Sequence, residues 1–414
     1  GLPPCIVTSI DFDYCNRELV AFTYGKGVWR ISYDGVITQN RTITESLHVK
    51  PREEYNVIND LIVEPGATVL IEGVMRFAPG HGMIIQPGGK VIVDGGLLAG
   101  DCHQSWRGVE VRGNPLLSQS PGNQGELVLK NGAYLEDAEI GVHAGHYDNG
   151  NLTLGGGIVR GTNSTIQNCQ IGVKLAPYIY CNAGGVALNN QSTFKGMMFS
   201  RNAVHDNDLA FLAHAQLHHV IGVKFYGCMF IDELAENPEY AGLYQGGYHS
   251  MGYGIDAHSS GFFVDHWCSS TTGMGDPCPE SDVIPSSFSG LNVGVAATDE
   301  TGSRYFSVRH SGFTGNRIGV WESGQQNGCV IAENTFTIYP VVGGFDLLGA
   351  SPVVGAHLRS TNGLELEGNQ FLGESMMEFG PPNQTTHGVI FDHLGPEANE
   401  CYRNTFDNLD TACM

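Results

Sequence analysis

The chain has 414 residues, with 43 Asp and Glu against 21 Lys and Arg, and a formal net charge of −22. This balance excludes nucleic acid and an anionic membrane surface as partners, because both select a cationic surface. Only 15% of the residues are charged, 57 are Gly and 41% are hydrophobic, which fits many short strands joined by turns better than a helical enzyme or a disordered chain. No apolar run reaches the ~18 residues of a membrane span, so no membrane insertion is expected.

The chain opens with three expected strands, at residues 5–12, 19–23 and 28–31. The last two are joined by the turn Tyr24-Gly25-Lys26-Gly27, whose glycines allow the positive φ of a tight hairpin. A three-stranded sheet is too small to have a core of its own. Residues 1–34 are therefore expected to belong to something larger.

Beyond residue 60 the apolar residues form very short runs, each followed by a turn. The runs at 61–63 and 83–85, for example, are each followed by a Pro-Gly turn. No window carries a long 3.6-residue apolar period, so helices are not expected.

Two phrases recur along this region at intervals within the range of solenoid repeats. The first is Ile-Gly-Val or Val-Gly-Val, at residues 140–142, 171–173, 221–223, 293–295 and 318–320. The second is Ser or Asn followed two residues later by Phe or Ile, at residues 164–166, 192–194, 334–336, 369–371 and 404–406.

Short strands with Gly and Asn at the corners predict an all-β fold, a right-handed parallel β-helix. Each strand would pair with its copy one coil along, inward side chains would stack into a continuous core, and Asn side chains would satisfy backbone groups at the bends. The alternative is a tandem of β-sandwiches. Irregular stretches near 232–252 and 267–286 are expected to be loop insertions.

The 11 cysteines contain no CxxC pair, so a zinc ribbon is not expected. Several lie about ten residues apart, which favours local disulfides in an exported protein. The candidate pairs are Cys5–Cys15, Cys169–Cys181, Cys268–Cys278 and Cys401–Cys413. The alternative is buried free thiols within stacked strands.

The strand after Gly1-Leu2-Pro3 and the phrase at 19–29 resemble the closing blade of sialidase-like (BNR-type) β-propellers, where Arg is usual in place of Lys26. The resemblance implies that residues 1–34 are a terminal blade fragment and that the chain is a slice of a longer polypeptide. Residues 35–60 are then expected to be a linker or first capping strands.

Residues 63–67, 85–96 and 106–111 look like the right-handed β-helix regions of large Bacteroidota surface proteins, which the type IX system exports. The resemblance covers about 60–414 and implies that residues 61–414 form one β-helix. It also implies an extracellular, cell-surface location and a structural or adhesive role.

Many β-helices act on polysaccharides, and two short motifs suggest this chemistry. Asp265-His266 is like the Asp-His of pectate lyases, and Gly80-His81-Gly82 is like a pectinase motif. Their order is wrong for a pectinase and the companion motifs are missing. The pair Asp299-Glu300 is expected in a solvated loop rather than in a hydrolase site. The sequence therefore predicts no catalytic residues and a protein that is not an enzyme.

Metal and contact sites are weakly indicated. The cluster His214, His218 and His219 lies in a stretch that alternates like a strand, which favours surface or corner histidines over a metal site. Asp206 and Asp208 are weak candidates for a bound Ca²⁺, and no other cofactor is expected. Four aromatic residues of the insertions could contact a glycan or protein or only cap the loop: Tyr244, Tyr248, Tyr253 and Trp267.

The function predicted from the sequence is a structural or adhesive segment of a giant cell-surface protein, assembled into a multimeric appendage or filament. Its expected partners are other copies of itself, flanking domains of the same long chain, and cell-surface glycans or proteins. The alternatives are a polysaccharide-binding or polysaccharide-degrading lyase or hydrolase, and a passive spacer.

Overall fold

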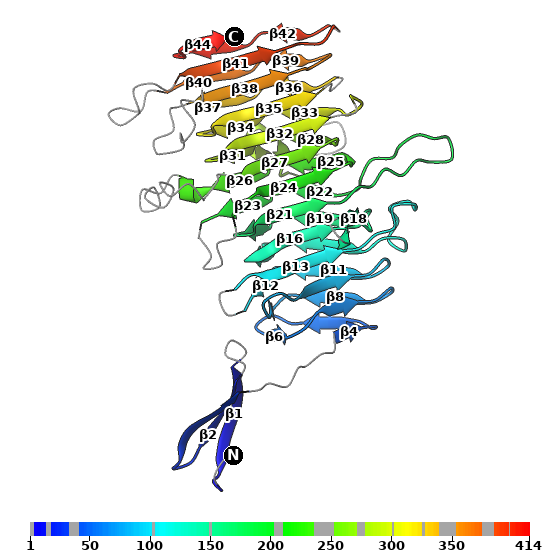
Figure 1. Cartoon of the computed structure of the whole chain (residues 1–414), viewed down its shortest axis with the longest axis vertical. Coiled ribbons are helices and arrows are strands. Elements are labelled where there is room, and N and C mark those ends of the chain that lie inside the picture. The colour runs from blue at the N-terminus through cyan, green and yellow to red at the C-terminus, as the bar shows by residue number, and fades with distance from the viewer. Residues whose placement is uncertain are drawn as a thin grey trace.

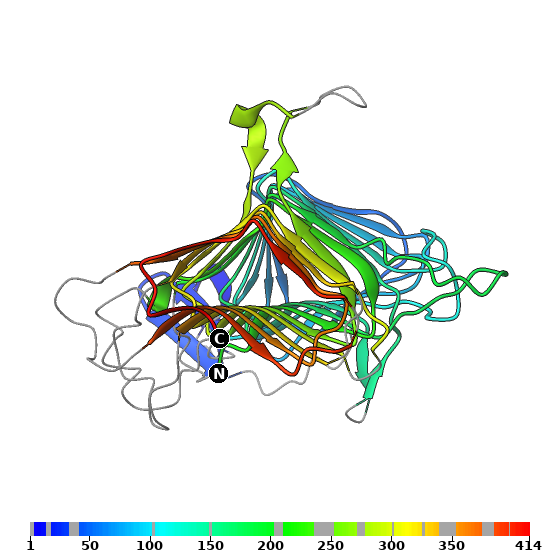
Figure 2. The same ribbon diagram turned by 90° about the horizontal axis from the view of Figure 1, so that it is seen from above.

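The computed structural model describes residues 4–13, 18–32, 41–101, 104–148, 151–202, 210–235, 252–270, 278–299, 302–324, 328–338, 353–374, 385–396 and 398–414. Most of the chain winds into a right-handed parallel β-helix, as the sequence predicts (Figure 1). Seen along its axis, the helix has a triangular cross-section, with one parallel sheet on each side (Figure 2).

The three sheets are called sheet I, sheet II and sheet III, in the order in which the chain passes through each coil. Among the described residues, sheet I contains β4 (Arg41–Ile43), β7 (Leu61–Val63), β10 (Gly82–Ile85), β13 (Trp106–Val111), β16 (Ala138–Ala144), β21 (Ile171–Leu175), β24 (Ala213–His218), β27 (Tyr253–His258), β32 (Val293–Asp299), β35 (Ile318–Gly324), β38 (Val353–Arg359), β41 (Thr386–Asp392) and β44 (Thr411–Cys413). Sheet II contains β5 (Leu47–Val49), β8 (Thr68–Ile71), β11 (Lys90–Asp94), β14 (Glu126–Lys130), β19 (Ile158–Thr162), β22 (Thr193–Lys195), β25 (Ile221–Tyr226), β28 (Gly261–Asp265), β33 (Phe306–Arg309), β36 (Val330–Ala332), β39 (Glu365–Glu367) and β42 (Glu400–Tyr402). Sheet III contains β6 (Glu54–Val57), β9 (Val74–Phe77), β12 (Leu97–Gly100), β15 (Tyr134–Glu136), β20 (Thr165–Gln167), β23 (Met198–Arg201), β26 (Met229–Asp232), β31 (Ser286–Ser289), β34 (Ser311–Thr314), β37 (Thr335–Ile338), β40 (Gln370–Gly373) and β43 (Thr405–Asp407).

Smaller elements lie outside these sheets. The N-terminal residues form an antiparallel sheet of β1 (Val7–Asp13), β2 (Glu18–Thr23) and β3 (Gly27–Ser32). Two hairpins project from the helix, β17 (His146–Asp148) with β18 (Asn151–Thr153), and β29 (Trp267–Cys268) with β30 (Val283–Ile284). The helical elements of the described chain are two 3-10 turns, η1 (Glu233–Ala235) and η2 (Glu280–Asp282). In this part of the protein, no helix is both long enough and apolar enough to cross a membrane.

The β-helix begins earlier than expected. Strands β4, β5 and β6 already pair with β7, β8 and β9, so the first coil starts at Arg41, within the segment 35–60 assigned to a linker or capping strands. The N-terminal sheet has the three predicted strands and carries exposed apolar side chains, including Ile10 and Ile31. Its assignment to a β-propeller stays a prediction.

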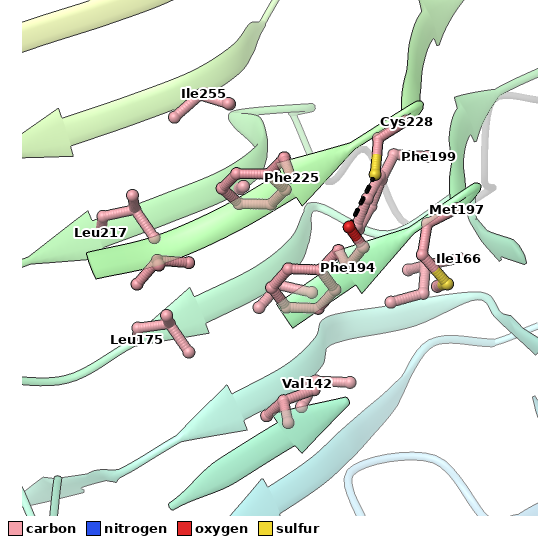
Figure 3. Close-up of a cluster of buried hydrophobic side chains, with 14 of the residues drawn as sticks. Val142, Ile166, Leu175, Phe194, Met197, Phe199, Leu217, Phe225, Cys228 and Ile255 are labelled. Carbon is pink, nitrogen blue, oxygen red and sulfur yellow. Dashed lines mark hydrogen bonds between the residues drawn. The ribbon is translucent and has the colours of Figure 1, made fainter. Parts of the chain in front are cut away.

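The core is a set of side-chain columns that run along the axis. On sheet III, phenyl rings stack from coil to coil with centroids 4.7–5.0 Å apart, through Phe199, Phe230, Phe288, Phe313, Phe336, Phe371 and Phe406. On sheet II, Phe194 and Phe225 stack in the same way, 5.0 Å apart (Figure 3). Each ring before Phe406 is kept from water by the coils before and after it, so the core is continuous along the helix.

The Ile-Gly-Val phrase explains how the two sheets meet. A Cβ on Gly294 would lie 2.9 Å from the Phe313 ring, and a Cβ on Gly319 would lie 2.7 Å from the Phe336 ring. The glycine of sheet I thus makes room for the phenyl ring of sheet III in the same coil. This is why the two recurring phrases alternate along the sequence.

The predicted equivalence of the Ile-Gly-Val copies holds for four of the five. Val142 pairs with Val173, and Val295 pairs with Val320, all in sheet I. The copy at 221–223 is an exception because it lies in β25 of sheet II. There Gly222 has a φ of +79° and lies against Asn189, so the glycine of this copy has a different structural role from the glycines in sheet I.

Buried asparagines form the predicted ladder at the corner between sheets II and III. Asn369 donates from Nδ2 to the carbonyl of Ile331 at 2.9 Å and to Oδ1 of Asn404 at 2.9 Å. Its own Oδ1 accepts from the backbone N–H and from Nδ2 of Asn334, each at 3.0 Å. Each amide therefore satisfies a backbone N–H and a carbonyl of the preceding coil that would otherwise be buried without a partner.

The cysteines depart from most of the expected pairings. Cys268 and Cys278 form a disulfide with a Cα–Cα distance of 5.8 Å. Five other candidates are free, so the pairs Cys5–Cys15, Cys169–Cys181 and Cys401–Cys413 do not form; Cys15 itself lies outside the described residues. Cys169 is buried in the core while Cys181 is exposed, and Cys401 and Cys413 lie on strands of two different sheets, II and I. Close spacing in sequence does not bring such side chains together.

Glu322 places a carboxyl group in the core. Glu322 of β35 is fully buried in the column of Ala297 and Leu358, where Thr361 donates a hydrogen bond to its Oε2. Its Oε1 has no hydrogen-bond partner among the described residues. Burial raises the pKa of Glu322 to about 9, so the carboxyl is neutral at pH 7.

Replacing Asn369 by Ala is expected to lower the free energy of unfolding by about 3 kcal/mol, because the Ile331 carbonyl and the Asn334 N–H of the preceding coil lose their partner. Urea unfolding of the two proteins measures the difference. The control is Asn151→Ala, at an exposed position of β18, which should change the value by no more than about 0.5 kcal/mol. Equal effects of the two substitutions would contradict the ladder.

Glu322 is expected to make stability fall as the pH rises. Its pKa is higher in the folded chain than its ordinary value of 4.5, so the folded state binds more protons between pH 4.5 and about 9, and stability is lost across that interval. Glu322→Gln removes this dependence. In urea unfolding, the free energy of unfolding of the variant relative to the wild type should therefore rise from pH 5 towards pH 9. Parallel stability curves would show that the carboxyl is not buried as a neutral acid.

Candidate functional site

The outer face of sheet I carries a group of polar side chains that successive coils bring together. The pairing of strands places in register one outward residue from each of β13, β16, β21, β24 and β27. These residues are Glu110, His143, Lys174, Gln216 and Asp256. Two positions further along the strands, a second row is formed by His218, His258 and Thr298. Together with His146 and Tyr147 of β17, these residues are called the sheet I face.

Local sequence explains why these side chains point outward. In the two clearest copies, Ile-Gly-Val is followed directly by His143 or Lys174, and strand residues alternate between the two faces of a sheet. Val142 and Val173 point into the core, as Figure 3 shows for Val142. The residue that follows each valine must therefore point to the opposite, outer face.

The β17–β18 hairpin forms a wall beside this face. It leaves the corner at the end of β16 and projects past the outer side of sheet I (Figure 2). Tyr147 comes from this hairpin, and its hydroxyl accepts a hydrogen bond from Nζ of Lys174 at 2.7 Å. The ammonium group also lies 4.7 Å from the centre of the Tyr147 ring. Lys174 is only 6% exposed, so the hairpin and the flanking coils shield most of its side chain from solvent.

Lys174 carries a positive charge that no ion pair in the described chain neutralises. Its hydrogen-bond partner is the neutral Tyr147, and within the described part of the chain no carboxylate forms an ion pair with it. The acidic residues nearby have other partners: Glu110 pairs with Arg112 and, at 3.0 Å, with Nδ1 of His146. A shielded, unpaired ammonium group favours the binding of an anionic group from outside.

The carboxylate of Asp256 is held by contacts with two neighbouring side chains of the face. Its Oδ1 lies 3.0 Å from Nε2 of His258, and its Oδ2 accepts from Nε2 of Gln216 at 3.2 Å. Thr298 Oγ1 lies 3.1 Å from the other ring nitrogen of His258. The carboxylate and the imidazole are therefore both fixed in orientation.

Two histidines of the face are neutral at pH 7. Burial lowers the pKa of His143 to about 4, with Glu110 opposing the shift and Lys174 adding to it. Burial, followed by the charges of Lys174 and His258, lowers the pKa of His218 to about 4. The Nε2 atoms of both rings are buried, and neither has a hydrogen-bond partner among the described residues. Neutral imidazoles beside a cation can accept a proton from a bound ligand.

The structure separates the residues named from the sequence. His214 is buried against Phe211 and bonds through Nε2 to the Ile231 carbonyl at 3.1 Å, whereas His218 faces outward and His219 takes a left-handed corner conformation. The three histidines therefore form no common metal site. His81 lies on another coil, 3.5 Å from Asp60.

Other candidates cannot be placed. Asp206, Asp208, Tyr244 and Tyr248 lie outside the described residues, so the calcium site and half of the aromatic group stay predictions. Tyr253 begins β27 and is half-buried, while Trp267 begins β29, with its indole against Gly196 and its Cβ against Gly227. Asp265 and His266 lie together with residues of later coils at a different corner.

Most residues of the sheet I face were missed from the sequence. Glu110, His143, Lys174 and Asp256 stand on four separate strands, and only the register of the coils brings them together. One signal was present: the residue directly after each Ile-Gly-Val must point outward, and in three copies it is polar, as His143 and Lys174 in sheet I and Lys224 in sheet II.

The chain is similar in fold to a solved structure, although its sequence matches no known family. No family model matches the chain, and no curated protein matches it. A solved structure of a mutant periplasmic alginate epimerase is similar at 8% sequence identity with a TM-score of 0.29, over 91% of this chain and 86% of that one. No residue role is transferred at this level of likeness. The expectation that the chain is not an enzyme nevertheless has to be corrected, because the matched structure is that of an enzyme.

Replacing Lys174 by Met is expected to raise the pKa of both His143 and His218, because the lysine charge lowers both. Histidine-selective NMR titration measures the two values. The matched control is Lys130→Met, which removes a cation paired with Asp94 at 2.8 Å on sheet II and should leave both titrations unchanged. Unshifted titrations in the Lys174 variant would contradict the geometry of the face.

Proposed function

We propose that this protein binds an acidic polysaccharide along the outer face of sheet I and modifies it at a uronate residue. The observation that carries the proposal is the shielded ammonium group of Lys174, which lacks a carboxylate partner in the described chain and lies next to Tyr147 and two neutral imidazoles. A uronate carboxylate bound to Lys174 would supply the missing negative charge.

The reaction class that fits these groups is removal of the proton on the carbon that bears the carboxylate. An imidazole, His143 or His218, takes the proton, and the electron pair moves into the carboxylate, where Lys174 stabilises the added charge. Return of a proton from the Tyr147 hydroxyl to the other face of that carbon gives the epimer. The imidazolium and the phenolate then exchange their protons with solvent.

The same carbanion has a second outcome. Breakage of the neighbouring carbon–oxygen bond gives an unsaturated sugar, and the released oxygen takes a proton to become a hydroxyl group. Epimerisation and elimination thus share the first step and differ in which bond changes next. An extracellular or periplasmic location is part of the proposal, because such polysaccharides are found there.

The shape of the face favours a chain-like ligand. Its polar residues lie on neighbouring strands that are spaced about 4.8 Å apart, so contacts repeat along the axis of the helix. The β17–β18 hairpin lies on one side of this face (Figure 2). A linear polymer can follow such a surface over several coils.

We expect a polyuronate, incubated with the protein in D₂O, to gain deuterium at the carbon next to its carboxylate, as read by NMR, or to give unsaturated products with ultraviolet absorbance. Lys174→Met and Tyr147→Phe should each lower the rate by roughly 10²-fold or more, whereas Lys130→Met should keep it. Neutral glucans should be unchanged. Binding of polyuronates without exchange or elimination would contradict catalysis and would support the adhesive role predicted from the sequence.

A further inference from the structure

A second polar cluster lies at the corner between sheets II and III, the apex of the triangle opposite sheet I (Figure 2). Asp265 ends β28 and is followed by His266. His310 directly follows β33, and Glu333 directly follows β36. Because β28, β33 and β36 are neighbours in sheet II, these four residues come from three successive coils.

The four side chains converge. Oδ1 of Asp265 lies 2.8 Å from Nδ1 of His266 and 2.8 Å from Nδ1 of His310. The two imidazole rings are perpendicular, with centroids 4.7 Å apart. Asp265, His266 and His310 each offer one ligand atom, and these atoms all lie within 4.8 Å of one another. Glu333 contacts the other ring nitrogen of His310 through a carboxylate oxygen.

We propose that Asp265, His266 and His310 bind a divalent transition-metal ion, zinc in the first place. Two imidazoles and one carboxylate are the donor set that zinc accepts, whereas calcium and magnesium select oxygen ligands alone. A tetrahedral ion with bonds of about 2.0–2.1 Å needs ligand atoms about 3.3 Å apart. Small ring rotations of His266 and His310 would open the 2.8 Å separations to this value.

Glu333 is assigned a positioning role. When its carboxylate accepts a hydrogen bond from Nε2 of His310, the proton of the neutral ring is on Nε2, and Nδ1 is free to bind the ion. Carboxylates that hold a metal-binding histidine in this way are a regular feature of zinc sites. Without the ion, both ring nitrogens can donate to the two carboxylates only if the imidazole is charged.

The surrounding structure leaves the cluster accessible. The nearby β29–β30 hairpin carries the Cys268–Cys278 disulfide, and Trp267 at its base lies over Gly196 and Gly227 of the two preceding coils. The base of the hairpin is thus packed over the N-terminal side of the corner. Asp265, His266 and His310 keep side-chain exposures of 30%, 30% and 38%, so a fourth ligand position can be filled by water or by an external ligand.

The proposal is independent of the polysaccharide reaction and is tested by metal binding alone. Full-length chain freed of metal with a chelator should bind about one Zn²⁺ with micromolar or tighter affinity by calorimetry. It should also give visible ligand-field bands with Co²⁺, and excess Ca²⁺ or Mg²⁺ should not compete. In the wild type, zinc should shift the imidazole NMR signals of His266 and His310, a readout that needs no substitution.

Variants distinguish metal binding at this site from nonspecific binding to the protein surface. His310→Ala should abolish the one-site binding, and Glu333→Gln should weaken it roughly 10–100-fold. The matched control is His393→Ala, which removes a more exposed histidine that is also beside an aspartate, at another corner. Equal loss in the His393 variant, unshifted signals of His266 and His310, or no binding tighter than millimolar would each overturn the proposal.

Discussion

In its C-terminal coils, from β27 onward, the β-helix depends on one steric relation, the contact between a glycine of sheet I and a phenyl ring of sheet III in the same coil. A Cβ on Gly254 would lie 2.7 Å from Phe288, and one on Gly355 would lie 2.5 Å from Phe371. A larger residue would push the two sheets apart in that coil and break the ring stack to the coils on either side. Where a coil lacks this glycine, the change is local: His214 takes the position between Gly172 and Gly254 and finds its own hydrogen bond at the Ile231 carbonyl.

A fixed core fixes the outside as well. Once Val142 and Val173 point inward, His143 and Lys174 must stand on the outer face one coil apart. The corners can vary in sequence and length, because insertions leave the helix there without changing the strands. The β17–β18 hairpin brings Tyr147 onto Lys174, and the β29–β30 hairpin leaves its corner beside Asp265. The core therefore aligns the outward side chains of successive coils, and the hairpins at the corners add further residues to the two polar clusters.

The fold could be predicted from the sequence because its cause is repeated in every coil. Short apolar runs mark the strands, most copies of the two recurring phrases lie in sheets I and III, and the buried Asn334 and Asn369 make the expected bonds at the bends. The copy at 221–223 was misplaced because an Ile-Gly-Val phrase suits either sheet until neighbouring strands are known. The sites were harder to predict, since they depend on register between distant residues. Asp265-His266 was noticed, but its partner His310 belongs to the next coil. Cysteine spacing failed for a similar reason, because Cys169 points into the core and Cys181 does not.

The constant strand spacing of sheet I has a consequence for how such a protein can change over evolutionary time. A duplicated or deleted coil would shift everything beyond it by one strand spacing, about 4.8 Å, while each phenyl ring, glycine and asparagine would meet the same kind of neighbour as before. The length of the polar face can thus grow or shrink in whole steps without a new core. Proteins with the same triangular β-helix could then bind polysaccharide segments of different lengths. The number of sugar units bound would follow from the number of coils between two functional side chains.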